Sequence, residues 1–498
     1  MSAIQELNDD KINHIREKEY PNLSNHVYLD HAGMTLYSRC LIENASKALV
    51  SNLMANPHSL STLSKNTERL VHNTRSEVLK LFKADPAIYD IAFTANATGA
   101  IKILAESIKD TTNGRFKYNY NVNSHTSVLG VRSLCDNYFD FKMFSDMDEM
   151  TGFLKTDSEH TSDSKLTLIA WLGQSNFNGE ILPMNSWNTA FKAYATEKKD
   201  VFTLFDASSL CTTSPPDLSD SATSPDFICC SFYKMFGYPD LGGLIFKKSE
   251  GAKIFPNRKY FGGGTIDSLS PDDSFVARRS QLFETIEDGT LPIHSIVQLS
   301  EAIKAHDKLY GNYKNISLYT KKITIECYNK LLNLRYPNNQ RMIEIYSPVI
   351  DELENGIIKE LTMDNFNHGP IIAFSLLDQN ARYLGYFNFE KFASARDVSL
   401  RTGGVCNVGG VCKWLNTNAK ELENAYNSGH TCGDEMDIIN ERPSGIVRVS
   451  FGAMTNSQDI DTLIECIKEF TSSPDRLSGE PQGVSLVGSY SNVVKTHA

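Results

Sequence analysis

The sequence predicts an α/β protein built on a largely parallel sheet. Several short apolar runs lack the strict polar–apolar alternation of half-exposed strands, which is typical of strands covered on both faces. These runs are IYDIAFTA (88–95), KLTLIAWLG (165–173), DVFTLFDAS (200–208), DFICCSFYK (226–234) and GGLIFKK (242–248). Between the first two, Ile101, Leu104, Ala105 and Ile108 recur at helical spacing. Strands that alternate with helices favour an α/β fold.

The length of 498 residues suggests two or three domains. After about residue 300 the pattern changes, because a long helical stretch, roughly 296–333, leads into a further strand, PIIAFSLL (370–377). This change indicates a domain boundary. The last segment, from about 473 to 498, is rich in Ser, Gly and Pro and predicts a flexible tail.

Composition excludes several classes of protein. Hydrophobic residues make up 41% and charged residues 22% of the chain, as in ordinary globular proteins. The net charge of −11 argues against a nucleic-acid partner, which needs cations to neutralise phosphates. No apolar run approaches the roughly 18 residues of a membrane-spanning helix, so no membrane association is expected. The charged N-terminus lacks a secretory pattern, and the ten cysteines are expected to be reduced thiols in the cytoplasm.

Two residues at predicted strand ends point to cofactor chemistry. Lys234 closes the run at 226–234, and burial there lowers the pKa of a lysine, so that its neutral amine can form a Schiff base with an aldehyde. Asp206 lies at the carboxyl end of the preceding strand, where ligands of α/β sheets collect. This pair suits pyridoxal phosphate, with Asp206 keeping the pyridine nitrogen protonated. The alternatives are a surface lysine at a strand end and an aspartate that caps a turn.

A phosphate cradle is predicted between the first strand and the following helix. Backbone N–H groups at a helix N-terminus point at an anion, and Thr98 adds a hydroxyl there while Gly99 permits close approach. The alternative is that Thr98 is only the N-cap of the helix.

Cys406 lies in RTGGVCNVGGVC (401–412), whose four glycines predict a mobile loop that carries an exposed thiol. Two alternatives stay open. The cysteine is inert, or a zinc site uses Cys406, Cys412, His430 and Cys432. The spacing of the first two is wider than is usual for zinc thiolates.

Two more residues are candidates for binding roles. Arg448 lies in a strand-like run, SGIVRVSF (444–451), and its planar guanidinium suits a substrate carboxylate. A surface ion pair is the alternative. His125 could stack on a flat ring or carry a proton, although a lone histidine is commonly structural.

Taken together, these segments resemble the NifS-like, class V pyridoxal-phosphate enzymes, the cysteine desulfurases, and most of all the N-terminal domain of eukaryotic molybdenum cofactor sulfurases. The resemblance runs from about residue 26 to about 470. It rests on YLDHAG (28–33), NPHS (56–59), SHTSV (124–128), QSNF (174–177), SFYK (231–234), FGGGT (261–265), EDGT (287–290), RTGGVC (401–406), GHTCGD (429–434) and VRVSFG (447–452).

The resemblance implies the fold of type I pyridoxal-phosphate transferases. In that fold a large domain with a mostly parallel, seven-stranded type of sheet carries a smaller α/β C-terminal domain. We expect residues 1–55 to pack on the small domain, 56–305 to form the cofactor-binding domain, 306–472 to form the small domain with a mobile cysteine loop, and 473–498 to form the tail.

The resemblance also assigns roles, residue by residue. Lys234 is the Schiff-base lysine, Asp206 the partner of the pyridine nitrogen and His125 the imidazole stacked on the ring. Asn176 lies near the ring hydroxyl and the substrate carboxylate, and Arg448 binds that carboxylate. Thr98 and Ser231 bind the phosphate, as does Thr290 from the neighbouring subunit of a homodimer. Cys406 is the persulfide-forming thiol.

The implied activity is conversion of L-cysteine to L-alanine with a persulfide on Cys406, for sulfuration of molybdenum cofactor.

The sequence departs from many NifS-like enzymes at Tyr233, where they carry His, and at Ser209, where they carry Gln. Gly404 replaces a second loop cysteine that is common in the sulfurases. The resemblance ends near residue 470, before the usual cofactor-binding domain. The alternatives are therefore a desulfurase, a selenocysteine lyase or an aminotransferase-like relative that serves another acceptor, and a non-catalytic zinc-binding protein.

Overall fold

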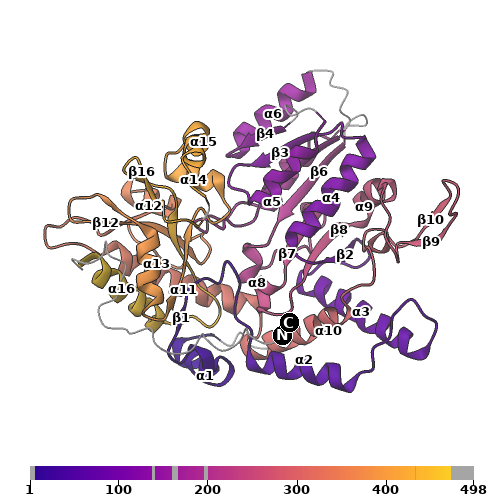
Figure 1. Cartoon of the computed structure of the whole chain (residues 1–498), viewed down its shortest axis with the longest axis horizontal. Helices are drawn as coiled ribbons and strands as arrows, with labels where there is room; N and C mark the ends of the chain where they lie inside the picture. The colour runs from indigo at the N-terminus through magenta and orange to yellow at the C-terminus, as the bar shows by residue number, and fades with distance from the viewer. Residues whose placement is uncertain (1–5, 137–140, 160–165, 196–199, 432, 473–498) are drawn as a thin grey trace, which may run out of the picture.

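The protein is seen in a computed structural model that describes residues 6–136, 141–159, 166–195, 200–431 and 433–472. Two sheets, each with its own hydrophobic core, organise these residues (Figure 1). The larger sheet and its helices lie on one side of the molecule, and the smaller sheet and its helices lie on the other.

The larger sheet has seven strands and confirms the predicted α/β class. Six strands run parallel to one another, and β8 runs antiparallel to both of its neighbours. In spatial order the strands are β2 (Tyr89–Thr94), β8 (Gly242–Lys247), β7 (Phe227–Ser231), β6 (Asp200–Asp206), β5 (Leu166–Leu172), β3 (Lys117–Asn121) and β4 (Phe141–Phe144). The five apolar runs singled out in the sequence all form strands of this sheet.

Both faces of the sheet are covered, which is why its central strands are apolar without alternation. One face packs against α3 (Thr62–Leu81), α6 (Met147–Glu159), α7 (Asn185–Lys192) and α10 (Ile293–Tyr310). The other face packs against α4 (Ala97–Thr112) and α5 (Thr126–Leu129). Trp171 on β5 illustrates the result, since it is fully buried and meets Phe191 and Phe205 edge-on.

The smaller sheet is antiparallel. Its strands are β11 (Ile343–Ile345), β12 (Ile371–Leu377), β18 (Ile446–Ser450) and β15 (Arg401–Gly403), with β13 (Tyr383–Leu384) paired to the end of β12. The core around it includes side chains of α11 (Tyr313–Leu332), α13 (Tyr386–Ser394) and α16 (Ser457–Ser472). The remaining elements are α8 (Tyr233–Phe236), α9 (Lys248–Ile254), β9 (Ile266–Leu269), β10 (Val276–Arg278), α12 (Pro348–Glu354), α14 (Val408–Trp414), α15 (Ala419–Asn427), β16 (Ile438–Ile439) and β17 (Arg442–Pro443).

The helical stretch expected over 296–333 is confirmed, and it consists of two helices. Gly311 has a φ of +81° and ends α10, and the side chain of Asn312 then accepts a hydrogen bond from the backbone of Asn315 to start α11. The left-handed φ suits glycine and explains why the chain turns at this residue.

The N-terminal residues join both cores. Ile12 and Ile15 of α1 (Asp9–Glu19) pack in the smaller core, and β1 (Val27–Tyr28) pairs in parallel with β14 (Val398–Ser399). By contrast, α2 (Arg39–Ser51) packs along α10 at the base of the larger core. Residues expected as one segment, 1–55, thus divide between the two cores. The expected tail, 473–498, lies outside the described residues.

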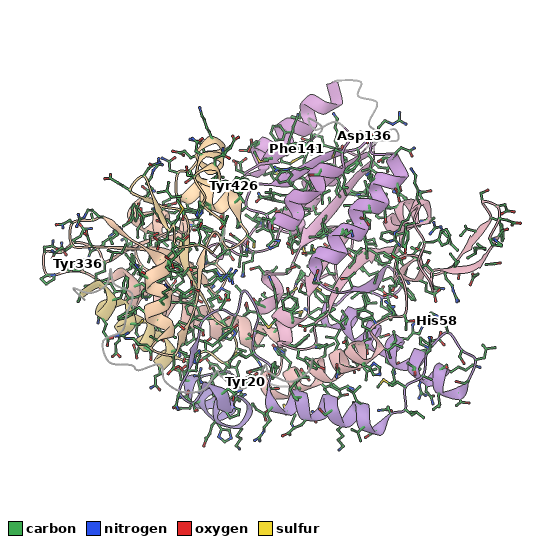
Figure 2. All side chains as sticks on the ribbon, viewed as in Figure 1. Tyr20, His58, Asp136, Phe141, Tyr336 and Tyr426 are labelled. Carbon is green, nitrogen blue, oxygen red and sulfur yellow. The ribbon has the colours of Figure 1, made fainter. Side chains whose placement is uncertain are left out.

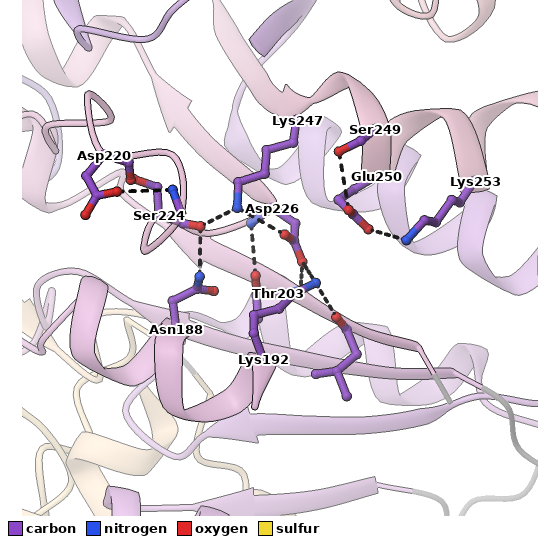
Figure 3. Close-up of polar contacts among 12 residues, drawn as sticks. Asn188, Lys192, Thr203, Asp220, Ser224, Asp226, Lys247, Ser249, Glu250 and Lys253 are labelled. Carbon is purple, nitrogen blue, oxygen red and sulfur yellow. Dashed lines mark hydrogen bonds and ion pairs between the residues drawn. The ribbon is translucent and has the colours of Figure 1, made fainter. Parts of the chain in front are cut away.

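A buried carboxylate fixes the larger sheet at the edge where β7 begins. Asp226 is 1% exposed, and its carboxylate accepts a hydrogen bond from the backbone N–H of Thr203 on the neighbouring strand (Figure 3). The backbone N–H of Asp226 in turn donates to the hydroxyl oxygen of Thr203. Lys192 and Lys247 bring their amines within 2.9 and 3.4 Å of its two oxygens. Burial lowers the pKa of Lys247 in this cluster, against the attraction of Asp226. The carboxylate therefore ties α7, β6 and β8 to the start of β7.

We predict that Asp226→Ala destabilises the protein by about 3–5 kcal/mol, because it removes the buried carboxylate that pairs with both Lys192 and Lys247. Denaturant unfolding followed by fluorescence measures the loss. Asp217→Ala is the matched control, since Asp217 pairs with Lys83 in solvent and is expected to cost about 1 kcal/mol or less. Equal losses for the two variants would contradict the prediction.

Candidate active site

A cavity of about 510 Å³ lies where the carboxyl ends of β5, β6 and β7 meet the N-termini of α4 and α5. This is the edge at which open α/β sheets bind ligands. Six of the nine site residues predicted from the sequence line it, namely Thr98, His125, Asn176, Asp206, Ser231 and Lys234. It is also lined by residues that carried no predicted role, including Asn96, Ser127, Gln174, Ser208, Ser209 and Tyr233.

Lys234 enters the cavity from a single helical turn, α8, that follows β7. Gly237 ends this turn with a φ of +76°, and a Cβ there would lie 2.4 Å from the backbone nitrogen of Tyr37, so the turn needs glycine. The Lys234 amine has no hydrogen bond or ion pair with any residue in the described part of the chain. Burial lowers the pKa of Lys234, with Asp206 acting against this shift and Arg448 adding to it. Burial thus favours the uncharged, nucleophilic form of the amine more than exposure to water would.

Asp206 ends β6 and its carboxylate is held in place by two donors. Its Oδ1 accepts a hydrogen bond of 2.9 Å from the backbone of Ser208 and one of 3.6 Å from the thiol of Cys229 on β7. The side chain is 8% exposed. A buried anion held in this way, facing a cavity, can pair with a protonated ring nitrogen.

The N-terminus of α4 provides donors for an anion. Asn96 caps the helix, since its side chain accepts a hydrogen bond of 2.9 Å from the backbone of Gly99. The alternative that Thr98 is the N-cap is therefore wrong, and Thr98 lies in the first turn, facing the cavity. Ser231 accepts a bond of 3.0 Å from the backbone of Ala97 and so joins β7 to this helix end. The arrangement suits a phosphate group.

His125 caps α5 and is held as a neutral ring. Its Nδ1 accepts a hydrogen bond of 3.1 Å from the backbone N–H of Ser127, which places the proton of the neutral ring on Nε2. Burial lowers the pKa of His125, although the carboxylate of Asp206 opposes the shift. A neutral imidazole at this wall can lie against a flat ring.

Cys406 reaches the same place from the smaller sheet, on the turn between β15 and α14. Its backbone oxygen accepts a hydrogen bond of 3.2 Å from Thr126, next to His125. The side chain of Asn176 donates to the oxygen of Val405 over 2.7 Å. The Cys406 residue itself is exposed, and its side chain is close enough to Lys234 to influence the pKa of that lysine. The thiol loop therefore lies at the mouth of the cavity.

The glycines around Cys406 have a different physical role from the mobility that the sequence suggested. Gly409 and Gly410 lie inside α14, where a Cβ on Gly409 would fall 1.8 Å from the oxygen of Val122 and one on Gly410 would fall 2.7 Å from the ring of Phe177. Both positions need glycine so that the helix can approach the larger domain. Before the thiol, Gly403 ends β15 and Gly404 lies in the loop itself.

Arg448 lies in the middle of β18 and is 4% exposed, so the alternative of a surface ion pair is wrong. Its guanidinium donates to the backbone oxygen of Asn176 over 2.8 Å and to the carboxylate of Asp30 over 2.6 Å. Its Nε has no hydrogen-bond partner within the described ranges. Asp30 was not assigned a role from the sequence, because its contact with Arg448 spans 418 positions.

Thr290 does not join the other candidates. It is exposed, it follows the turn at Gly289, and it is not among the residues that line the cavity. The zinc alternative finds no support in the described residues, where no three potential ligands group together, although Cys432 lies outside those residues.

Gln174 shows how the cavity accommodates one departure noted in the sequence. Its side-chain nitrogen donates to the hydroxyl of Ser209 over 3.1 Å, so an amide from the segment that follows β5 occupies the space beside the serine. Tyr233, which stands where many NifS-like enzymes carry His, lines the cavity next to Lys234.

Solved structures share this fold. The apo cysteine desulfurase from Thermococcus onnurineus NA1 superposes with a TM-score of 0.68 and 17% identity, covering 95% of this chain and 99% of that one. The S-sulfonic acid form of a cysteine desulfurase from Escherichia coli gives a TM-score of 0.65 and 17% identity, covering 92% and 98%. These likenesses define the class of fold, and a sequence comparison identifies the family.

The model of the aminotransferase class-V family matches residues 27–355, and the chain belongs to this family. The chain is also similar to proteins named molybdenum cofactor sulfurase. The one from Aspergillus fumigatus is 42% identical over 460 residues, covering 92% of this chain and 53% of the relative. That from Chaetomium globosum is 36% identical over 480 residues, covering 95% and 59%. The chain spans about half the length of these relatives.

We predict that an alkylating reagent modifies Cys406 well before the buried cysteines of the larger domain. Cys406 is exposed, whereas burial raises the pKa of Cys211, Cys229 and Cys230 and keeps them as thiols. Timed iodoacetamide treatment of the native protein with peptide mass mapping measures the order. Modification of these buried thiols at the rate of Cys406 would contradict it, and denatured protein provides the control in which all react.

Proposed function

We propose that the protein is a pyridoxal-phosphate-dependent cysteine desulfurase that supplies sulfur for molybdenum cofactor. The observation that carries the proposal is the meeting of three groups at one cavity, the buried amine of Lys234, the buried carboxylate of Asp206 and the thiol loop of Cys406. The relatives named molybdenum cofactor sulfurase support the sulfur acceptor.

The residues of the cavity fit pyridoxal phosphate. Lys234 offers an unpaired amine for the aldehyde, and Asp206 offers an anion for the ring nitrogen. The first turn of α4, with Thr98 and the hydroxyl of Ser231, would hold the phosphate, and His125 would lie against the ring. The buried hydroxyl of Ser208 has no hydrogen-bond partner among the described atoms and also faces this cavity. An unsatisfied buried donor is costly, which supports a polar ligand beside it.

When bound, pyridoxal phosphate supplies an aldehyde for amines and a ring that withdraws electrons from the substrate Cα. The other steps belong to the chain. Lys234 would remove the proton from Cα, and burial, which lowers the pKa of its amine, favours this role as a base. Asp206 would pair with the ring nitrogen and keep it protonated, which favours the electron withdrawal that the ring would supply.

Arg448 would bind the carboxylate of L-cysteine. The guanidinium is fixed by the backbone of Asn176 and by Asp30, and its Nε remains available for another acceptor. Asn176 stands beside it and contributes to the same subsite. Fixing the carboxylate orients the Cα–H bond toward Lys234, and such orientation is worth several kcal/mol of the barrier.

Cys406 would take the sulfur. Its thiolate attacks the sulfur of the substrate, the carbon–sulfur bond breaks, and the electron pair of that bond stays on carbon, which is protonated to give L-alanine. The sum is L-cysteine plus the Cys406 thiol giving L-alanine plus a Cys406 persulfide, with no external oxidant or reductant. Exposure of the thiol at the cavity mouth suits onward transfer to an acceptor.

We place this reaction in the cytoplasm, because an exposed catalytic thiol survives only where reductants keep it from oxidation. No helix in the described ranges has both the length and the apolar character to cross a bilayer.

The function is tested by two variants of the full chain. We expect Lys234→Ala to lose the borohydride-reducible visible absorption of the purified protein and to form no alanine from L-cysteine. We expect Cys406→Ser to keep that absorption and to form alanine at least 100-fold more slowly, because the substrate sulfur then lacks the thiol that is placed to accept it.

Cys412→Ser is the matched control, since Cys412 is a half-buried thiol six residues further on, and this variant should retain activity. A colourless wild-type protein that ignores added pyridoxal phosphate would overturn the proposal. If the protein forms alanine from selenocysteine but not from cysteine, its function is that of a selenocysteine lyase instead.

We also propose that the protein acts as a homodimer in which Thr290 contacts the phosphate of the partner subunit. Thr290 is exposed and follows Gly289, whose backbone N–H donates to the oxygen of Gly263 over 2.7 Å. A Cβ built on Gly264 would lie 3.2 Å from the ring of His58 and 3.4 Å from the oxygen of Gly289, so these segments lie together. His58 lies in the connection from α2 to α3, on the side of the larger domain that carries the β9–β10 hairpin (Figures 1 and 2). Large apolar side chains are exposed between the end of α2 and the start of α3 and around the β9–β10 hairpin, including Val50, Leu53, Leu60, Tyr260, Leu269 and Phe275. Exposed apolar residues in these segments favour a protein interface.

Mixing two inactive variants tests the shared site. Thr290→Asp should repel the phosphate, and Lys234→Ala cannot react. If the sites are shared, mixed dimers have one site free of both defects, and co-refolded or co-expressed variants should recover about a quarter of wild-type activity. No recovery, with dimers confirmed by light scattering, would show that Thr290 does not act across the interface.

A further inference from the structure

Asn407, the residue after the candidate thiol, links the two domains at the cavity. Its side chain is completely buried. Its Nδ2 donates to the backbone oxygen of Asn123 over 2.8 Å and to Oδ1 of Asn176 over 3.0 Å. Its Oδ1 accepts a bond of 2.8 Å from the backbone of Gly410 and so caps α14. One amide therefore joins the small-domain loop, the larger domain and a residue of the cavity.

The link with Asn176 runs in both directions. While Asn407 donates to its Oδ1, Asn176 donates through Nδ2 to the oxygen of Val405. The two asparagines thus hold the residues on either side of Cys406. The oxygen of Cys406 is in turn bonded by the backbone of Thr126. The thiol is fixed relative to the cavity through its neighbours, while its own side chain stays exposed.

The backbone at the thiol needs such a restraint. Val405 has a φ of 44° and Cys406 a φ of 55°, which is the left-handed region, and it is unfavourable for a β-branched residue such as valine. Two successive residues of this kind persist only when their surroundings hold them. The bonds from Asn176, Asn407 and Thr126 are these surroundings.

We propose that Asn407 is a positioning residue for the reaction, which holds the Cys406 thiol in reach of the substrate sulfur through its bonds to Asn176 and Asn123. The inference rests on the proposed desulfurase function and deepens it. Because Asn176 also faces the cavity, the same bonds make the position of the thiol depend on the residue that meets the substrate.

The test separates this role from helix capping. Asn407→Ser keeps a side-chain oxygen that can cap α14 but is too short to reach Asn123 and Asn176. We expect 10- to 100-fold lower kcat for alanine formation, because a displacement of about 1 Å has such an effect, with a KM for L-cysteine within threefold of wild type. The visible absorption of bound pyridoxal phosphate should be unchanged.

Asn418→Ser is the matched control, because Asn418 caps α15 in the same way but contacts no residue of the cavity, and its kcat should stay within twofold of wild type. A second measurement needs no activity. The amide of Thr126 should exchange its hydrogen slowly in the wild type and at least tenfold faster in Asn407→Ser, since its acceptor is the loop oxygen of Cys406.

Wild-type kcat in Asn407→Ser would overturn the inference while leaving the desulfurase function intact, whereas absence of alanine in the wild type would overturn the function first. Should Asn407→Ser fail to fold, fast exchange of the Thr126 amide in the wild-type protein would still contradict the restraint, and slow exchange would support it.

Discussion

The candidate active site depends on one constraint. The amine of Lys234 is buried away from water, and no acidic side chain in the described part of the chain pairs with it directly. Burial lowers the pKa of this lysine, and Asp206 lies close enough to oppose the shift but bonds to Ser208 and Cys229 instead. The parallel strands make this possible, because β6 and β7 end at the same edge and present one residue each.

The second sheet contributes what the first cannot. The cavity of the larger domain holds an amine, a carboxylate and donors for an anion, but the thiol and the guanidinium come from β15–α14 and β18. The close approach of α14, which Gly409 and Gly410 permit, brings these groups together. Site assembly is therefore a matter of domain packing, and a mutation at the contact between the domains can act on chemistry without touching a reacting group.

Much of the architecture follows from local pattern. The strands β2, β5, β6, β7 and β8 can be predicted from their apolar runs, because both faces of the sheet are buried. The strands β3 and β4 were missed, since KYNYN and FKMF mix lysine and asparagine with aromatic residues, and only the packed aromatics reveal their burial. Lys234 and Asp206 could be found from strand ends. Asp30 and Asn407 could not, because their partners lie 418 and 231 positions away.

The contact of α1 with α16 has a consequence for how the protein is made. Arg16 binds Asp459 through two hydrogen bonds, of 2.6 and 3.0 Å, across 443 positions of the chain. During synthesis the N-terminal residues emerge first, so the ion pair of Arg16 forms only after residue 459 has left the ribosome. Asp30 follows α1 closely and waits in the same way for Arg448, so the pocket for the guanidinium is completed only after β18 has emerged.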